Sequence, residues 1–305
     1  MALEFDNIIN FRDVGKTVND FLGGRRIVKE GVLYRSARPD DGTPRDRERL
    51  RDELGIKTVI DLRTKTEHAR QAEKRQADMR VPALLQSNAA LAEPMQIPGL
   101  RYLECKITGG RFETFLLGQL SWLSFFQVII LYVLGYRMQA VSIVSRDVMV
   151  PRGLVGMGLD TVDQSGGEIA EALRTLTEPA SLPLLVHCTQ GKDRTGLIVI
   201  IVLMALAGNI NNNGNDDKSN ALLTEEAINH DYLLSRHGFV GPERDARLAE
   251  IREMGLTPEW LGCPEDLVSR LHRHVASRYG GINGYLDGIG FGADERRRLV
   301  EALGA

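Results

Sequence analysis

The sequence has few cysteines, the residues that cross-link secreted proteins, and no excess of the basic residues that bind nucleic acids. It has three cysteines in 305 residues, and an odd, sparse set does not make a disulfide framework. Free thiols persist in a reducing compartment. Its 38 basic and 41 acidic residues give a net charge of −3, without the basic surplus of nucleic-acid-binding proteins. We therefore expect no nucleic-acid partner, and any anion site must be built locally.

The amino-terminal residues lack the apolar run of a signal peptide, since Glu4 and Asp6 come early. A cytoplasmic protein is the expectation. The chain is 43% hydrophobic and 26% charged, which is ordinary for a globular protein that buries a sizeable core. No shift in composition marks a boundary, so we predict a single domain over residues 1–305.

One long segment, residues 114–136, lacks charge altogether. About 20 apolar residues can cross a bilayer. Here polar side chains interrupt the segment, and a span would separate strands that belong to one sheet. We expect it to lie within a helical lid insertion over residues 85–160. Peripheral membrane contact through 114–136, and hence membrane association, is the alternative to a buried lid helix.

The rest of the chain alternates between strand and helix patterns. Residues 26–28 and 32–34 flank Gly31 as in a hairpin, and residues 57–62 form a β-branched strand. This rhythm predicts an α/β fold with a mainly parallel central sheet flanked by helices. The Asn-rich stretch 209–220 has few apolar residues, and we expect a disordered surface loop there.

The segment 187–196 (HCTQGKDRTG) stands between two apolar stretches. Residues 182–186 are typical of a central parallel strand, and residues 195–207 of a buried helix. A tight loop between such elements turns its backbone N–H groups inward, and the helix start adds its positive dipole end. The segment therefore predicts an anion site.

Two side chains in this segment, Cys188 and Arg194, indicate a reaction at the bound anion. The field of the loop stabilises the thiolate of Cys188, which is the nucleophilic form. Arg194 follows six residues later, and its planar fork can hold two phosphate oxygens at once. We predict attack of Cys188 on phosphorus, with Arg194 and the loop amides stabilising the developing charge and with neither metal nor cofactor.

The other loop residues have supporting roles in this hypothesis. Thr195 donates a hydrogen bond to the thiolate of Cys188 as it leaves. Gly191 permits a close backbone approach, and His187 orients the loop. The predicted substrate-binding residues are His187, Thr189, Gln190, Gly191 and Lys192.

The pattern HC-x5-RTG resembles the signature of cysteine-based protein-tyrosine and dual-specificity phosphatases. The fuller string is similar to fungal tyrosine/serine phosphatases, which are related to bacterial tyrosine phosphatases that also accept phosphoinositides. The matching stretches are residues 187–196, Asn10–Gly15, Leu33–Ser36, Asp61–Arg63 with Glu67, Asp231–Leu233 and Tyr279–Leu286. The resemblance implies a phosphocysteine mechanism.

The general acid that protonates the leaving oxygen stays open at this stage. The chain has no Trp-Pro-Asp tripeptide. Asp193 in the loop and Asp61 at a strand end are the candidates, and the resemblance favours Asp193. Asp61 has a second interpretation as a strand-end ion pair with Arg63 or Arg35. Asp160 and Asp163 are weaker candidates.

Lys192 also carries two interpretations. By resemblance to phosphoinositide phosphatases it adds charge for extra phosphates; otherwise it is a solvated loop lysine. The leading hypothesis is a phosphatase acting on phosphotyrosine proteins. The alternatives are a phosphoinositide phosphatase with the same machinery and an inactive phospho-binding module.

Overall fold

The computed structural model describes residues 5–79, 96–210, 222–238 and 241–305. Five strands form one sheet in the order β1-β2-β5-β3-β4. Their bounds are β1 (Arg12–Asp13), β2 (Leu33–Ser36), β3 (Thr58–Asp61), β4 (Arg101–Glu104) and β5 (Leu184–His187). β1 pairs antiparallel with β2, and the other neighbours pair in parallel. The predicted α/β class with a mainly parallel sheet is confirmed.

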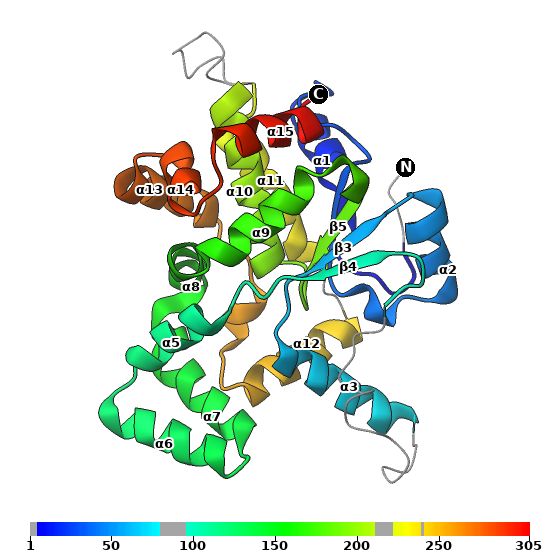
Figure 1. The fold of residues 1–305 in the computed structure, drawn as a ribbon. Helices are drawn as coiled ribbons and strands as arrows, with labels where there is room; N and C mark the ends of the chain where they lie inside the picture. Colours follow the sequence, from blue (N-terminus) through cyan, green and yellow to red (C-terminus); the bar gives the residue numbers. More distant parts are fainter. Residues whose placement is uncertain (1–4, 80–95, 211–221, 239–240) are drawn as a thin grey trace.

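Helices cover both faces of this sheet (Figure 1). The helices are α1 (Val14–Phe21), α2 (Pro44–Glu48), α3 (Lys65–Met79), α5 (Gly110–Gly118), α6 (Trp122–Val133), α7 (Arg137–Val144), α8 (Val150–Gln164), α9 (Gly166–Leu176), α10 (Asp193–Ile210), α11 (Glu225–Leu233), α12 (Gly241–Glu253), α13 (Leu267–Tyr279), α14 (Ile282–Gly288) and α15 (Ala293–Leu303).

Alternation along the strands divides the core between the two faces. In β5, Leu184 and Val186 belong to the large cluster beneath the helical layer, whereas Leu185 joins a smaller cluster on the opposite face. α10 lies in the large cluster and packs on α9, α11, α14 and α15. Its residues 197–206 are all buried, which explains why its sequence is apolar on every side.

The ends of the parallel strands are in register, and this alignment positions the site. His187 at the end of β5 lies opposite Ser36 of β2 on one side and Asp61 of β3 on the other. Because ligands of open α/β sheets bind outside the carboxyl ends of the strands, this edge is where a site is expected. The loop after β5 begins there.

One sequence prediction about local structure is wrong. Residues 26–28 and 32–34 do not pair with each other: β2 pairs with β1 and β5, and Val28 bridges to Gly304. Within the range 85–160 of the expected helical insertion, Arg101–Glu104 form β4, an edge strand of the sheet. Residues 80–95 lie outside the described residues. Helices run from Gly110 onward.

The charge-free segment forms two helices rather than one. The first, α5, ends at Gly118, and Ser121 starts the second, because its hydroxyl accepts a hydrogen bond from the backbone N–H of Ser124 (3.2 Å) and so caps α6. α6 packs mainly on α7 at the outer tip of a helical arm and not over the loop after β5 (Figure 1). No helix in the described residues is long and apolar enough to cross a membrane.

The Asn-rich stretch is described only at its start. Asn209 and Ile210 belong to α10, so the predicted loop begins later than residue 209. Residues 211–220 lie outside the described residues. The side-chain amide of Asn209 donates to the carbonyl of Ala205 (2.7 Å), which stabilises the last turn of α10.

Candidate active site

Cys188 lies buried at the point where β5 ends and the loop to α10 begins. α10 starts at Asp193, so the loop occupies residues 188–192. The helix therefore directs its amino end at the same space as the loop. This is the arrangement that concentrates positive potential on an anion.

The carbonyl groups of the loop accept hydrogen bonds from residues outside it. The carbonyls of residues 189–191 accept hydrogen bonds from the backbone N–H of Arg38 (3.4 Å), Asn10 Nδ2 (2.9 Å) and Arg35 Nη2 (2.9 Å), respectively. Within the described residues, the N–H groups of 189–192 have no protein acceptor. Four amide donors thus remain for a ligand, as an anion cradle requires.

Gly191 is required by this geometry. Its φ is +69°, and a Cβ there would lie 2.3 Å from the carbonyl carbon and oxygen of Ser36 and 2.4 Å from the nitrogen of Ala37. No side chain fits at that distance. The prediction that Gly191 permits a close backbone approach is confirmed.

A buried ion cluster holds Arg35 against the loop. Arg35 and Arg12 both contact Asp231, at 2.5 and 2.8 Å. Burial favours the neutral acid at Asp231, but the two guanidinium groups outweigh it and lower its pKa. The carboxylate therefore stays charged and fixes the arginine that anchors Gly191.

Arg194 is aimed by Glu67, a residue to which the sequence analysis gave no role. Arg194 Nη1 and Nη2 donate to Glu67 Oε2 and Oε1 at 2.7 and 2.5 Å. The hydroxyl of Thr189 donates to the same carboxylate. Glu67 thus ties the arginine to the first turn of the loop.

A local signal in the sequence could have located Glu67. Thr64 and Glu67 form the two ends of a capping box at the start of α3, with the Thr64 N–H donating to Glu67 Oε2 (2.9 Å). α3 follows β3, whose carboxyl end lies beside that of β5. The pattern T-x-x-E after a parallel strand therefore places a carboxylate at the functional edge.

The charge states of this pair follow from their contact. Burial opposes ionisation of Glu67, but the adjacent Arg194 and the hydroxyl of Thr189 lower its pKa to about 2. Burial also opposes the charge of Arg194, yet Glu67 raises its pKa above the usual range. Both groups are therefore ionised at neutral pH.

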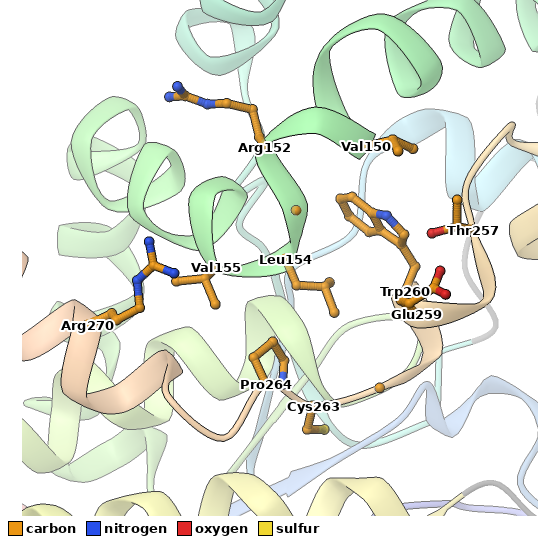
Figure 2. Close-up of a pocket in the computed structure, with 12 residues that line it drawn as sticks. Val150, Arg152, Leu154, Val155, Thr257, Glu259, Trp260, Cys263, Pro264 and Arg270 are labelled. Atoms are coloured by element: carbon orange, nitrogen blue, oxygen red, sulfur yellow. The ribbon is translucent and has the colours of Figure 1, made fainter.

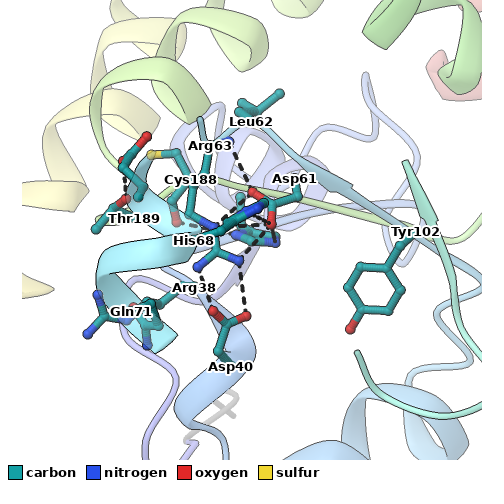
Figure 3. A network of polar contacts seen from close by, with 12 residues as sticks. Arg38, Asp40, Asp61, Leu62, Arg63, His68, Gln71, Tyr102, Cys188 and Thr189 are labelled. Carbon is teal, nitrogen blue, oxygen red and sulfur yellow. Dashed lines mark hydrogen bonds and ion pairs between the residues drawn. The ribbon is translucent and has the colours of Figure 1, made fainter. Parts of the chain in front are cut away.

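Asp61 sits in a second buried network, shown in Figure 3. Its carboxylate contacts Arg63 Nη2 (2.6 Å) and His68 Nε2 (3.0 Å), and Arg63 also contacts Asp40 (2.5 Å). Its side chain is 1% exposed. Burial alone would raise the pKa of Asp61, but His187, His68 and Arg63 lower it far below the usual range.

These contacts favour Asp193 over Asp61 as the general acid. The carboxyl of Asp61 is enclosed by the protein and its oxygens are bound by Arg63 and His68, so it does not face the position of a leaving group. The interpretation of Asp61 as a strand-end ion pair with Arg63 is confirmed. Of the upstream candidates, Asp160 pairs with Arg152 (2.7 Å), and Asp163 accepts from Tyr279 (2.7 Å).

Asp193 and Lys192 differ sharply in their surroundings. Asp193 is 45% exposed at the start of α10, whereas Lys192 is fully buried. The Lys192 ammonium donates to the carbonyls of Trp260 (2.8 Å) and Gly262 (2.6 Å) and lies 3.2 Å from Asp193 Oδ1. The interpretation of Lys192 as a solvated lysine is wrong, and its ammonium is not open to a substrate phosphate in this structure.

The remaining predicted residues lie around Cys188. The His187 ring is buried, with Nδ1 3.3 Å from the carbonyl of Cys188, and burial lowers its pKa although Asp61 opposes this. The hydroxyl of Thr195 and Oε1 of Gln190 are buried without a hydrogen-bond partner in the described part of the chain. The Thr195 hydroxyl can donate to the thiolate or to a bound oxyanion, whereas Oε1 of Gln190 can only accept a hydrogen bond, for example from water.

No group of three or more potential metal ligands is found among His, Cys, Asp and Glu of the described ranges. The positive groups at the loop are the Arg194 guanidinium, the free amides and the start of α10. These are the groups from which the protein itself can stabilise a bound oxyanion.

Comparison with known proteins identifies two relationships. The sequence matches the family model described as "Tyrosine phosphatase family" over residues 3–212 and 219–305. A stretch of 133 residues is 32% identical to a tyrosine-protein phosphatase from Nostoc commune, covering 40% of this chain and 39% of the relative. The alignment thus spans about two fifths of the length of that curated relative.

Proposed function

Because this chain belongs to the tyrosine phosphatase family, we propose that it hydrolyses phosphate monoesters of tyrosine in proteins through a phosphocysteine on Cys188. The observation that carries the proposal is the loop itself. Its carbonyls are turned outward and bound, its amides are free, and Cys188 and Arg194 stand at its two ends. This is a preorganised cradle for three phosphate oxygens with a nucleophile beneath them.

In the first step the thiolate of Cys188 attacks phosphorus, and the P–O bond to tyrosine breaks as the S–P bond forms. Asp193 transfers its carboxyl proton to the departing oxygen, which otherwise leaves as a phenolate of high basicity. Arg194 and the loop amides stabilise the charge on the equatorial oxygens. We assign Asp193 this role because it is the exposed carboxyl beside the loop.

In the second step water attacks the phosphocysteine. Asp193, now a carboxylate, accepts a proton from that water as the S–P bond breaks and inorganic phosphate forms. The unpartnered hydroxyl of Thr195 donates to the departing thiolate of Cys188. The enzyme returns to its starting protonation state, so the cycle needs neither metal nor cofactor.

The decisive test is Cys188→Ser, assayed with phosphotyrosine peptides and a metal chelator present. We expect turnover to vanish while phosphate-ester binding remains, because a serine hydroxyl stays protonated but the amide cradle and Arg194 are intact. A serine variant that keeps more than a few per cent of the wild-type rate would exclude the nucleophile. A wild-type protein that binds but never turns over would instead identify an inactive phospho-binding module.

Phosphoinositide hydrolysis is the second candidate, and the outer face of α6 favours it. The large exposed apolar side chains there are Trp122, Leu123, Phe126, Ile129, Ile130, Tyr132 and Val133. Aromatic and aliphatic side chains on one uncharged helix suit the interfacial region of a bilayer. We propose peripheral membrane contact through this face and cytoplasmic residence otherwise.

A substrate panel separates the two candidates. Phosphotyrosine, phosphoserine and phosphothreonine peptides are compared with phosphoinositides presented in vesicles, and vesicle flotation is measured for wild type and Phe126→Ser. We expect phosphotyrosine to be the best substrate, and Phe126→Ser to reduce flotation without changing peptide hydrolysis. Exclusive turnover of the lipids would favour the second candidate.

A further inference from the structure

Lys192 is the buried cation that the mechanism above does not use. Its side chain has no exposed surface, and removing an ammonium from water costs several kcal/mol unless it is paired and hydrogen-bonded. Here three acceptors surround it: the carbonyls of Trp260 and Gly262 and the carboxylate of Asp193. An ammonium has three donors, so its hydrogen-bonding capacity is filled within the protein.

The carbonyls bound by Lys192 belong to a segment far away in the sequence. We call residues 257–263 the strap; it contains a short 3₁₀ turn, Pro258–Leu261. One side of the strap is bound by Lys192, and its other side forms a wall of a pocket of about 510 Å³ that it shares with the start of α8 (Figure 2). Neither Cys188 nor Arg194 lines that pocket.

We infer that Lys192 is a positioning residue and not a substrate ligand. Its ammonium fastens the strap to the phosphate loop and, from the same point, holds the carboxyl of Asp193 in the orientation for proton transfer. The inference rests on the proposed function, since it presumes that Asp193 is the general acid. It assigns the phosphate oxygens to the loop amides and Arg194 alone.

A group that acts through the general acid has a distinctive kinetic signature. Proton donation matters most when the leaving phenol is basic, as tyrosine is, with a pKa of about 10. It matters least for a nitrophenyl ester, whose phenolate leaves unaided. A ligand of the phosphate group would instead affect both esters equally.

The first experiment compares Lys192→Met with Asp193→Asn on phenyl phosphate and p-nitrophenyl phosphate, with the exposed Lys16→Met as the matched control. We expect Asp193→Asn to lower kcat/KM on phenyl phosphate about 100-fold or more; kcat/KM is compared because it reports formation of the phosphocysteine and not its later hydrolysis, in which Asp193 acts on water for both esters. Lys192→Met should lower kcat/KM on phenyl phosphate roughly 10-fold, with less than about a 3-fold change on the nitrophenyl ester. In the Asp193→Asn background the Lys192 substitution should have no further effect on the leaving-group dependence.

The second experiment follows the strap directly. The chain has two tryptophans, so in a Trp122→Phe background the fluorescence reports Trp260 alone. Lys192→Met should shift this emission to longer wavelength and increase its quenching by acrylamide, whereas Lys16→Met should not. Should the methionine variant fail to fold, Lys192→Gln is used, which keeps two N–H donors without the charge.

Trp260 fluorescence in the Trp122→Phe protein, with Lys192 unchanged, tests the alternative that Lys192 binds the substrate. Vanadate or a soluble inositol polyphosphate should bind without moving the Trp260 signal, because Lys192 keeps its contact with the strap. A shift on binding would mean that the ammonium leaves the strap for the ligand, and would overturn the inference. Equal losses on both esters, or a leaving-group effect that persists with Asp193→Asn, would do the same.

Failure of the proposed function gives a different result. Cys188→Ser that remains active, or wild type with no turnover, would remove the acid role of Asp193 and with it the catalytic part of the inference. The Trp260 measurements would then still decide whether Lys192 fastens the strap. With an active wild type and an inactive Cys188→Ser, the kinetic results refer to Lys192 alone.

Discussion

At the scale of single residues, Arg194 and the phosphate-binding loop are each held in position by a side chain that we do not expect to contact phosphate. Glu67 holds both terminal nitrogens of Arg194, and Arg35 holds the carbonyl of Gly191. Such partners keep donors in place before the substrate arrives, which lowers the reorganisation that the transition state requires. Loss of Glu67, whose side chain is 29% exposed, should therefore reduce the rate more than the stability.

We predict that Glu67→Gln lowers kcat/KM for aryl phosphates about tenfold, equivalent to about 1.4 kcal/mol. The amide keeps one acceptor oxygen, but its NH₂ group faces a guanidinium donor, so the fork of Arg194 loses its alignment. Steady-state kinetics measure the effect, with Glu48→Gln on exposed α2 as the control. A change of less than twofold would contradict the positioning role of Glu67.

Asp61 and Asp193 form a matched pair for a second prediction. Asp61→Asn leaves buried Arg63 without its charge partner and should destabilise the fold by about 3 kcal/mol or more. The variant should keep the wild-type dependence on the leaving group. Asp193→Asn should instead give a steep dependence on the leaving group, with a smaller loss of thermal stability than Asp61→Asn, because the Asp193 side chain is 45% exposed. Leaving-group dependence in Asp61→Asn would mean that our assignment of the acid is wrong.

At the scale of elements, the loop between β5 and α10 depends on contact with β2. The strand ends are in register, so Gly191 meets the backbone of Ser36 and Ala37 at a distance that admits no Cβ. The approach of β2 holds the loop in the conformation that frees its amides. A substitution that pushes the loop away from β2 disturbs the whole cradle rather than one contact.

We predict that Gly191→Ala reduces activity by about 100-fold or more, comparable to removing a transition-state donor. The new methyl group cannot be accommodated, and φ of +69° is strained for alanine. Gly167→Ala in α9 is the control, because its Cβ meets no atom within 4 Å and alanine favours a helix. Kinetics and thermal melts are compared, and equal activity of the two variants would refute the fit argued for Gly191.

At the scale of the whole molecule, three ion-paired carboxylates, two of them buried, share one dependence on pH. The pKa values of Asp61, Glu67 and Asp231 are all lowered in the folded protein, that of Glu67 from 4.5 to about 2. A carboxyl whose pKa is lower when folded stabilises the protein above its unfolded pKa. That contribution is lost as the pH falls toward the folded value.

We therefore predict that the free energy of unfolding is constant above about pH 5 and declines as the pH falls from about 4.5 to 2. In this range the carboxyl groups of the unfolded chain bind protons, whereas these three remain ionised in the folded protein. Urea titrations at a series of pH values measure this. Glu67→Gln should show a shallower decline than wild type over that range. A wild-type stability that is independent of pH down to 2 would contradict the charge states argued for these networks.

What the sequence alone determined is what lies within a short stretch of chain. The strand, the loop and the helix around Cys188 and Arg194 follow from residues 182–207, because local hydrophobic pattern, glycine position and spacing are sufficient to build an anion cradle. The strand β3 follows from an equally local signal, the β-branched run of residues 57–62. Those features agree with the structure.

What only the tertiary structure decided is the partner of each buried charge. Lys192 meets carbonyls 68 and 70 residues away, and Arg194 meets Glu67 at a separation of 127 residues. The capping box places Glu67 at the functional edge but does not identify Arg194 as its partner, and no local signal identifies the carbonyls that Lys192 binds, because a charge buried by folding pairs with the group that the packed elements bring beside it. The exposed face of α6 is decided in the same way, since an apolar helix is buried only if the rest of the chain covers it.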